Sequence, residues 1–249
     1  MDFPSNILSR ILDIAIPRSC AGCKAPHEAF CAHCSEVSYS KWLGCVACGA
    51  RNITGVLCPQ TCRRKSPHAL KAVVWAGIYD NELKEAIWQL KYKKRRELAS
   101  PLGKLLIKKL ENRSPIFIEK SNIDIIVPVP LHPLKEHQRG FNQARLIAEV
   151  LGKELDLPVV SNILRRIKNT APQARTMNKD ERKKNMQGAF VANFSPLKRR
   201  DNTLSQSSKA PTVLLVDDVA TTGATVFDAA RALQEAGAKY IFGATIAHG

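Results

Sequence analysis

The sequence lacks several features that would place it in a common class of proteins. Only 6% of its 249 residues are aromatic, and no apolar run approaches the roughly 18 residues that a membrane-spanning helix needs. The opening residues, MDFPSNILSRILDIAIP, lack the long apolar stretch and small-residue cleavage site of a signal peptide. Cysteine is absent from the 187 residues that follow Cys62. These absences predict a cytoplasmic protein with no membrane span, whose first part differs chemically from the rest.

The composition is otherwise that of a globular protein with an excess of positive charge. Apolar residues make up 45% and charged residues 24%, which excludes a wholly disordered, collagenous or coiled-coil chain. The 38 Lys and Arg residues outnumber 22 Asp and Glu, for a net charge of +16. Residues 91–113 hold nine basic and two acidic residues, and residues 165–209 hold twelve and three. Two local cationic surfaces, and hence an anionic partner, are expected.

Strand and helix patterns alternate along most of the chain. The clearest buried strand is TVLLVDD at 212–218, and a helix is expected from Gly223 to about Ala236, with Gly237 as its C-cap. Other strands are expected at 72–79, 123–130, 159–164, 188–192 and 240–247. Other helices are expected at 7–15, after the cap at Asp80 or Asn81, after Pro101, and at 142–155. This alternation predicts an α/β fold with a mostly parallel sheet flanked by helices.

All eight cysteines lie in the first 62 residues and form four close pairs. The pairs are Cys20-x2-Cys23, Cys31-x2-Cys34, Cys45-x2-Cys48 and Cys58-x3-Cys62. Two complete sets of four thiolates suit two tetrahedral Zn²⁺ ions. The simplest pairing is sequential, with the first four cysteines on one zinc and the last four on the other, while a cross-braced pairing stays open. A disulfide framework is the alternative, and a cytosolic redox poise disfavours it.

The cysteine distribution divides the chain into two parts. Residues 1–66 are expected to form an N-terminal helix and a double zinc ribbon, and residues 67–249 the α/β domain. The stretch FSPLKRRDNTLSQSSKAP at 194–211 is polar and without periodicity, which predicts an exposed, mobile insertion.

The segment VLLVDDVATTGAT, residues 213–225, carries the strongest functional signal. Asp217 and Asp218 end a strand, and small and hydroxylated residues then lead into a helix. Backbone N–H groups from Thr221 to Thr225 would face an anion at the positive end of the helix dipole. The carboxylates suit a ribose diol or a water-bridged metal. A hydroxyl-rich helix cap is the alternative for the TTG alone, but the whole pattern favours a sugar carrying a 5′-phosphate.

Three segments carry a resemblance to known families. Residues 213–225 resemble the phosphoribosyl pyrophosphate (PRPP) signature of type I phosphoribosyltransferases. Together with that segment, PVPLHPLKEHQRGFNQARLIAEVL at 128–151, APQARTMNKDERKKNMQGAF at 171–190 and the leading cysteine pairs resemble the ComF family of competence-associated proteins. The resemblance covers nearly the whole chain apart from 194–211. It implies the type I phosphoribosyltransferase fold behind the zinc ribbons.

The resemblance implies roles for individual residues. It implies that the loop containing Val129 faces pyrophosphate and that Asp217 and Asp218 contact the ribose hydroxyls. It also implies a PRPP loop formed by Val219, Ala220, Thr221, Thr222, Gly223, Ala224 and Thr225, the last five holding the 5′-phosphate. Arg139 is expected at pyrophosphate or a second substrate, with a surface arginine as the alternative. Lys91 is expected at a phosphate, with a solvated basic turn as the alternative. The resemblance also implies that residues 170–188 form a flexible hood.

Two functions follow from these patterns. The resemblance implies a role in natural competence, in which single-stranded DNA enters the cytosol with an ATP-driven DNA translocase and a recombination mediator. The alternative is a true phosphoribosyltransferase, in which Mg²⁺ neutralises the departing pyrophosphate of PRPP and a base or amine is the acceptor. No nucleophile or general base pattern assigns a catalytic residue. The basic stretches suit DNA phosphates, whereas the few aromatic residues give no evident base-stacking platform.

Overall fold

The computed structural model describes residues 19–52, 54–58, 62, 66–113, 123–169, 188–195 and 210–249. The helix expected at 7–15, most of the hood expected at 170–188 and most of the insertion expected at 194–211 lie outside these residues.

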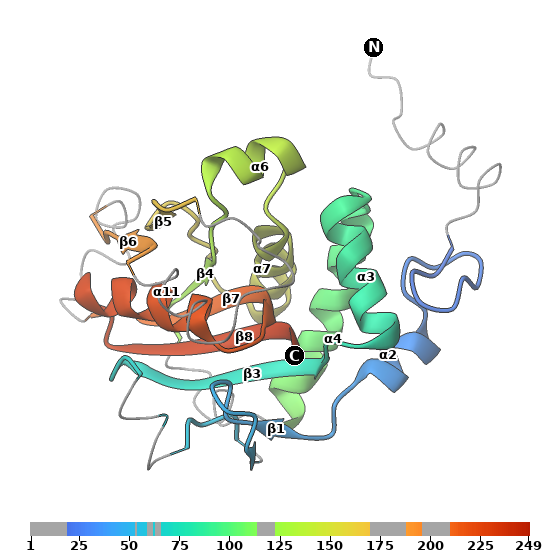
Figure 1. The fold of residues 1–249 in the computed structure, drawn as a ribbon, viewed down its shortest axis with the longest axis horizontal. Helices are drawn as coiled ribbons and strands as arrows, with labels where there is room; N and C mark the ends of the chain where they lie inside the picture. The colour runs from blue at the N-terminus through green and yellow to red at the C-terminus, as the bar shows by residue number, and fades with distance from the viewer. Residues whose placement is uncertain are drawn as a thin grey trace.

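A four-stranded parallel sheet forms the centre of the molecule (Figure 1). Its strands lie in the order β3 (Leu70–Ile78), β8 (Tyr240–His248), β7 (Thr212–Ala220) and β4 (Ile125–Pro128). The strands are nearly continuous runs of buried apolar residues, because parallel sheets are covered on both faces. The expected α/β fold with a parallel sheet is therefore confirmed.

Helices cover both faces of this sheet. Helices α4 (Ala99–Arg113) and α7 (Gln143–Leu155) pack together behind the sheet in Figure 1, and α11 (Ala224–Glu235) lies in front of it. Helix α3 (Asn81–Tyr92) stands beyond the end of β3 and is followed by a 3-10 turn, η2 (Arg96–Leu98). The Asn142 side chain caps α7 by accepting hydrogen bonds from Ala144 and Arg145. The C-cap of α11 is Ala236, one residue before the expected Gly237, which follows it with a φ of 106°.

Several short elements differ from the expectations. The strand expected at 159–164 begins only at Leu164, and Val159 makes an isolated bridge to Ile126. The resulting β5 (Leu164–Arg166) pairs antiparallel with β6 (Phe190–Ala192) in a separate two-stranded sheet. Helix α6 (Pro133–Arg139) was not expected, because it buries none of its residues and so shows no apolar periodicity. Helix α2 (Ala32–Ser38), capped by Cys31, was also not expected.

The cysteine-rich segment covers the free edge of β3. The Ser40 N–H donates to the Ala76 carbonyl over 2.8 Å, and the Val73 N–H donates to the Gly55 carbonyl over 2.9 Å. Strands β1 (Leu43–Gly44) and β2 (Arg51–Asn52) pair with each other in this segment, and its buried residues belong to the same hydrophobic core as the sheet. The segment thus shields an edge strand that would otherwise expose unpaired backbone groups. The boundary at residues 66 and 67 stays a prediction.

The topology creates a crevice between β4 and β7. These strands are neighbours, but the chain leaves β4 towards α7 behind the sheet and leaves β7 towards α11 in front of it. In open α/β sheets, ligands bind at the carboxyl ends of two such strands. Pro128, the last residue of β4, pairs with Val216, so the next two residues of β7 are Asp217 and Asp218. The fold therefore places the acidic pair in the crevice.

Among the helices of the described residues, none has the length and apolar character needed to cross a membrane.

Candidate functional site

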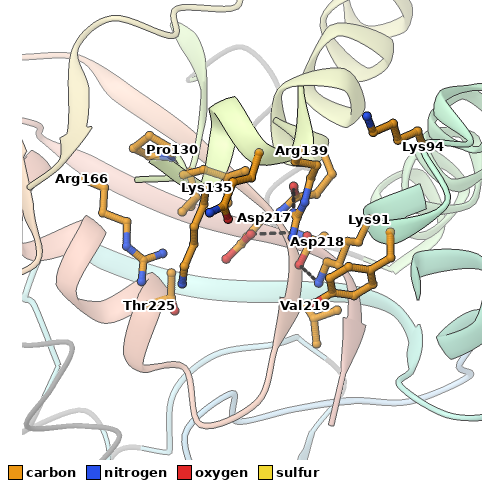
Figure 2. Close-up of a pocket in the computed structure, with 15 residues that line it drawn as sticks. Lys91, Lys94, Pro130, Lys135, Arg139, Arg166, Asp217, Asp218, Val219 and Thr225 are labelled. Atoms are coloured by element: carbon orange, nitrogen blue, oxygen red, sulfur yellow. Dashed lines mark hydrogen bonds and ion pairs between the residues drawn. The ribbon is translucent and has the colours of Figure 1, made fainter. Parts of the chain in front are cut away.

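A cavity of about 450 Å³ lies at the carboxyl ends of β4 and β7 (Figure 2). Its lining comes from segments far apart in the sequence: the end of α3, the loop after β4 with helix α6, the start of α7, strand β5, the end of β7 and the start of α11. The lining residues are Lys91, Tyr92, Lys94, Val129, Pro130, Leu131, Lys135, Gln138, Arg139, Gln143, Arg166, Asp217, Asp218, Val219 and Thr225. The structure thus brings together seven residues that the sequence analysis assigned to one site, Lys91, Val129, Arg139, Asp217, Asp218, Val219 and Thr225, whereas their ligand stays a prediction.

Two adjacent aspartates lie buried in the wall of this pocket. Asp217 is 8% exposed and Asp218 4%, and one Asp217 oxygen accepts the Asp218 N–H over 2.8 Å. Lys91 reaches from α3 and pairs with Asp218 Oδ1 over 2.8 Å. Asp218 Oδ2 is buried and has no hydrogen-bond partner among the described residues. Because a buried oxygen without a partner is costly, it marks a position for a donor or a cation from a ligand.

Burial and mutual repulsion set the charges of this group. Burial and the neighbouring Asp218 raise the pKa of Asp217 from an ordinary value of 3.8 to about 7. Burial acts to lower the pKa of Lys91, but the charge and hydrogen bond of Asp218 outweigh it and raise that pKa. Lys91 therefore stays protonated, and Asp217 is the carboxyl that changes charge near neutral pH.

Cations surround the acidic pair on several sides. Figure 2 shows Lys135 and Arg166 on the side of Thr225, and Lys91 and Lys94 on the side of α3. Burial lowers the pKa of Lys135, and the positive charges of Arg166 and Arg139 lower it further. Five cationic side chains thus line a pocket that holds two carboxylates. Such an excess favours a ligand with several negative charges.

Contacts within the fold hold two of these cations in place. The Arg139 guanidinium donates to Gln143 and lies over the Tyr92 ring, 5.4 Å from its centroid. Arg166 belongs to β5, which pairs with β6. The Asp228 carboxylate of α11 accepts the N–H groups of Gly188, Ala189 and Phe190 at the start of β6, over 2.7 to 3.1 Å. Helix α11 therefore carries the small sheet that presents Arg166.

The turn between β7 and α11 lies beside the cavity. Gly223 has a φ of 72°, a left-handed conformation that favours glycine, and α11 begins at the next residue. Thr225 lines the cavity, whereas Ala220, Thr221, Thr222, Gly223 and Ala224 form the turn without lining it. The Ala224 N–H makes a long 3.4 Å hydrogen bond to the Thr222 hydroxyl. The N-terminus of α11, a twelve-residue helix, thus lies beside the pocket with the positive end of its dipole.

Val129 lines the pocket with both of its backbone groups engaged. Its N–H donates to the Val216 carbonyl over 2.8 Å, and its carbonyl accepts the Asn142 side chain over 3.0 Å. Val129 therefore shapes the wall of the pocket, and its N–H is already used within the fold.

Sequence reasoning missed several lining residues, above all Lys135 and Arg166. Lys135 stands in an exposed helix without apolar periodicity, and Arg166 is the last residue of a three-residue strand. Neither position carries a local pattern that distinguishes it from a solvated cation. Their convergence arises from tertiary packing alone.

The cysteines form two separate clusters. One contains Cys20, Cys23, Cys31 and Cys34, the other Cys45, Cys48, Cys58 and Cys62, and in each the sulfur atoms lie within 4.8 Å of one another. The clusters follow the sequential grouping, and none of these eight cysteines is paired in a disulfide. Four thiolates at this spacing can bind Zn²⁺.

Hydrogen bonds within the first cluster favour ionised sulfur. The Cys31 N–H donates to the Cys20 sulfur over 3.3 Å. Burial acts to raise the pKa of Cys20, but neighbouring backbone N–H groups outweigh it and lower that pKa to about 6. Burial and the adjacent thiols raise the pKa of Cys34. Ionising Cys34 beside Cys20 is therefore unfavourable unless a cation offsets the negative charge.

Comparison with known proteins found relatives along nearly the full length of the chain. Competence protein F of Haemophilus influenzae is 30% identical over 237 residues, which cover 92% of this chain and 90% of that protein. DNA utilization protein YhgH of Escherichia coli K12 is 31% identical over 230 residues, covering 90% and 94%. Competence protein ComFC of Bacillus subtilis is 27% identical over 212 residues, covering 78% of each chain. No protein-family model matches the sequence.

The two clusters predict the metal content of the protein. Purified without chelator, it is expected to contain about two zinc ions per chain, and Cys23→Ser or Cys48→Ser to leave about one. Elemental analysis measures this, with His33→Ala as a control because His33 belongs to neither cluster. A zinc content near zero in the parent protein, with its thiols protected as disulfides, would contradict the assignment.

The raised pKa of Asp217 predicts a pH-dependent stability difference. Between about pH 4 and pH 7 the folded protein holds a proton on Asp217 that the unfolded chain has lost, so its contribution to stability falls as pH rises through this window. Asp217→Asn has no carboxyl group to ionise at this position, so its stability does not fall for this reason as the pH rises. Urea unfolding should show the variant gaining about 2 kcal/mol over the parent between pH 5.5 and pH 7.5. A gain that is independent of pH would show that Asp217 is not the titrating carboxyl.

Proposed function

Because this chain belongs to the ComF family of competence-associated proteins, we propose that it acts in natural competence and that its pocket binds PRPP with Mg²⁺. Its 30% identity to Competence protein F, over 90% of that protein, establishes the family. We also propose a cytoplasmic location for this activity.

One observation carries the PRPP assignment: a buried acidic pair and five cations share one pocket at the carboxyl ends of β4 and β7, beside the glycine turn that leads into α11. Carboxylates accept hydrogen bonds from a diol, and cations with a helix N-terminus bind phosphates. A ligand that carries a diol between two phosphate-bearing ends matches this arrangement. Simple nucleotides would leave one of the two cationic sides unused.

The cations separate into two groups that suit the two ends of PRPP. Lys135 and Arg166 lie on the side of Thr225 and α11, which suits the 5′-phosphate. Lys91, Lys94 and Arg139 lie towards α3 and α6, which suits the pyrophosphate. Asp217 and Asp218 stand between the two groups, where the ribose hydroxyls would lie.

The acidic pair also fits Mg²⁺. Hard cations prefer carboxylate oxygens, and the buried Asp218 Oδ2 is without a partner among the described residues. When bound with PRPP, Mg²⁺ supplies charge neutralisation for the pyrophosphate. The ion pair with Lys91 orients the Asp218 carboxylate, and burial keeps water from competing for its oxygens.

The competence assignment draws on the relatives and on surface charge. Two of the relatives carry competence in their names, and a third is named a DNA utilization protein. Lys93 and Lys94 are exposed in the turn after α3, at the edge of the pocket, within the basic stretch 91–113. We propose that single-stranded DNA contacts this surface, with an ATP-driven DNA translocase and a recombination mediator as partners.

The second candidate is a true phosphoribosyltransferase, and the same pocket favours it. Displacement at the ribose anomeric carbon needs a positioned PRPP and a stabilised leaving group, without a protein nucleophile. Release of pyrophosphate on addition of bases or amines separates this candidate from a protein that binds PRPP without turnover.

PRPP binding is the first prediction of this assignment. Calorimetric titration of the zinc-loaded protein with PRPP and Mg²⁺ should give saturable binding. The double variant Asp217→Ala, Asp218→Ala should lose at least about 100-fold in affinity, because it removes charge-assisted hydrogen bonds to the ligand.

The matched control is Asp124→Asn, which changes a carboxylate at the opposite end of the same sheet. Asp124 accepts the Thr212 N–H at the start of β7, away from the pocket. Affinity should be unchanged in this control. Absence of binding by the folded parent protein would refute the PRPP assignment.

DNA contact predicts a specific salt dependence. Binding of an unstructured oligothymidylate, followed by fluorescence anisotropy, should weaken steeply with salt. Lys93→Gln, Lys94→Gln should make the slope of log affinity against log salt shallower by about 1.4, roughly 0.7 for each lost single-strand phosphate contact. The control Lys153→Gln, Lys239→Gln removes the same charge from exposed positions outside the pocket. Equal slopes for the two double variants would exclude this surface as the DNA contact.

A further inference from the structure

We infer that Gln89, Arg95 and Val46 are positioning residues through which each cysteine cluster holds one wall of the pocket. The first cluster holds the end of α3, which carries Lys91, and the second holds the turn between β7 and α11. The inference rests on the proposed function for the identity of the ligand, whereas the mechanical connection concerns the protein alone.

Two side chains join the end of α3 to the first cluster. Arg95 donates from one nitrogen to the Ser19 carbonyl over 2.9 Å and from another to the Gln89 side chain over 2.8 Å. Gln89, which is 8% exposed, donates to the Ala21 carbonyl over 3.4 Å. Ser19 and Ala21 are the residues on either side of Cys20. The Gln89 and Arg95 side chains therefore form hydrogen bonds with the backbone on both sides of Cys20.

The same turn of chain carries the cations of the pocket. The Gln89 carbonyl accepts the N–H groups of Lys93 and Arg95, over 2.9 and 3.4 Å, and closes the turn that contains Lys94. Lys91 lies within this turn and reaches across to Asp218 over 2.8 Å. A shift of the turn by about 1 Å would lengthen that ion pair beyond hydrogen-bond distance.

The second cluster supports the opposite wall. Val46 is fully buried and belongs to the turn between Cys45 and Cys48. A Cβ placed on Gly223 would lie 3.3 Å from Val46 Cγ1, so the two turns are in direct contact. The Val46 carbonyl also lies 3.3 Å from His248 Nε2, at the end of β8. Val46 therefore packs the Cys45–Cys48 turn against the beginning of α11.

Metal loading is then a condition for the shape of the pocket. Metal bound to four thiolates fixes the turns that carry them, and metal loss frees the Cys20 turn or the Cys45–Cys48 turn. Metal loss from the first cluster should increase the mobility of the end of α3, and metal loss from the second cluster that of the turn between β7 and α11. The two clusters have separate effects at one ligand site, which distinguishes positioning from general stabilisation.

A crossed hydrogen-exchange experiment tests this separation. Cys23→Ser and Cys48→Ser change equivalent, exposed cysteines, one in each cluster. Exchange measured by mass spectrometry, without any ligand, should accelerate at residues 89–95 in Cys23→Ser and at residues 221–227 in Cys48→Ser. Accelerated exchange of both segments to the same extent in both variants, or of neither after metal loss, would overturn the inference.

Two further variants leave every cysteine in place. Arg95→Met and Val46→Ala should retain the metal content of the parent, reproduce the segment-specific acceleration, and weaken PRPP–Mg²⁺ binding roughly 3- to 10-fold. Arg145→Met, which breaks a surface ion pair with Glu149 on α7, is the control and should change neither quantity. These variants decide the question if a cysteine variant fails to fold.

The outcomes separate this inference from the proposed function. If the parent protein does not bind PRPP but exchange is accelerated as expected, the ligand assignment fails and the positioning role stands. If PRPP binds normally in Arg95→Met and Val46→Ala, and exchange is unchanged, the positioning role fails and the ligand assignment stands.

Discussion

Repulsion between two adjacent buried carboxylates governs the arrangement of the pocket. Successive side chains of a strand point to opposite faces, so Asp217 and Asp218 need compensation from different directions. Lys91 of α3 pairs with Asp218, and its charge also acts on Asp217, where Arg166 of β5 adds a second positive charge. The two cations come from parts of the chain 75 positions apart, and each depends on a supporting structure of its own. The packing around the pocket therefore brings these supports together where β7 ends.

Local patterns predicted the framework of the site but not its full composition. The run before Asp217 is apolar and the helix after Gly223 is periodic, so strand, turn and helix could be read from one continuous segment. The cysteine spacings likewise contain the ligand sets, although only the structure distinguishes the sequential grouping from a cross-braced one. Lys135 and Arg166 reach the pocket through contacts between distant elements, which no short window of sequence encodes. The assigned ligand stays a prediction.

The composition suggested two units of different chemistry, and the contacts between them are closer than that division implies. A Cβ on Gly77 of β3 would lie 2.2 Å from the Ser38 carbonyl, so the segment after α2 rests directly on the strand backbone. Lys109 of α4 is fully buried and donates to the Ser40 carbonyl over 2.5 Å. This close approach depends on the absence of a side chain at Gly77 and on the burial of the Lys109 side chain. Neither feature is visible in the spacing of the cysteines.

The covered edge of β3 has a consequence for the order of folding. During synthesis the cysteine-rich segment leaves the ribosome before β3, while β8, the parallel neighbour of β3, is made last. Until β8 has been synthesised, only the cysteine-rich segment of the two can form backbone hydrogen bonds with β3. A newly made strand whose backbone groups are unpaired is prone to aggregation. Early folding of the cysteine-rich segment would therefore protect β3 from aggregation until β8 completes the sheet. Availability of zinc during translation would then influence the yield of soluble protein as well as its stability once folded.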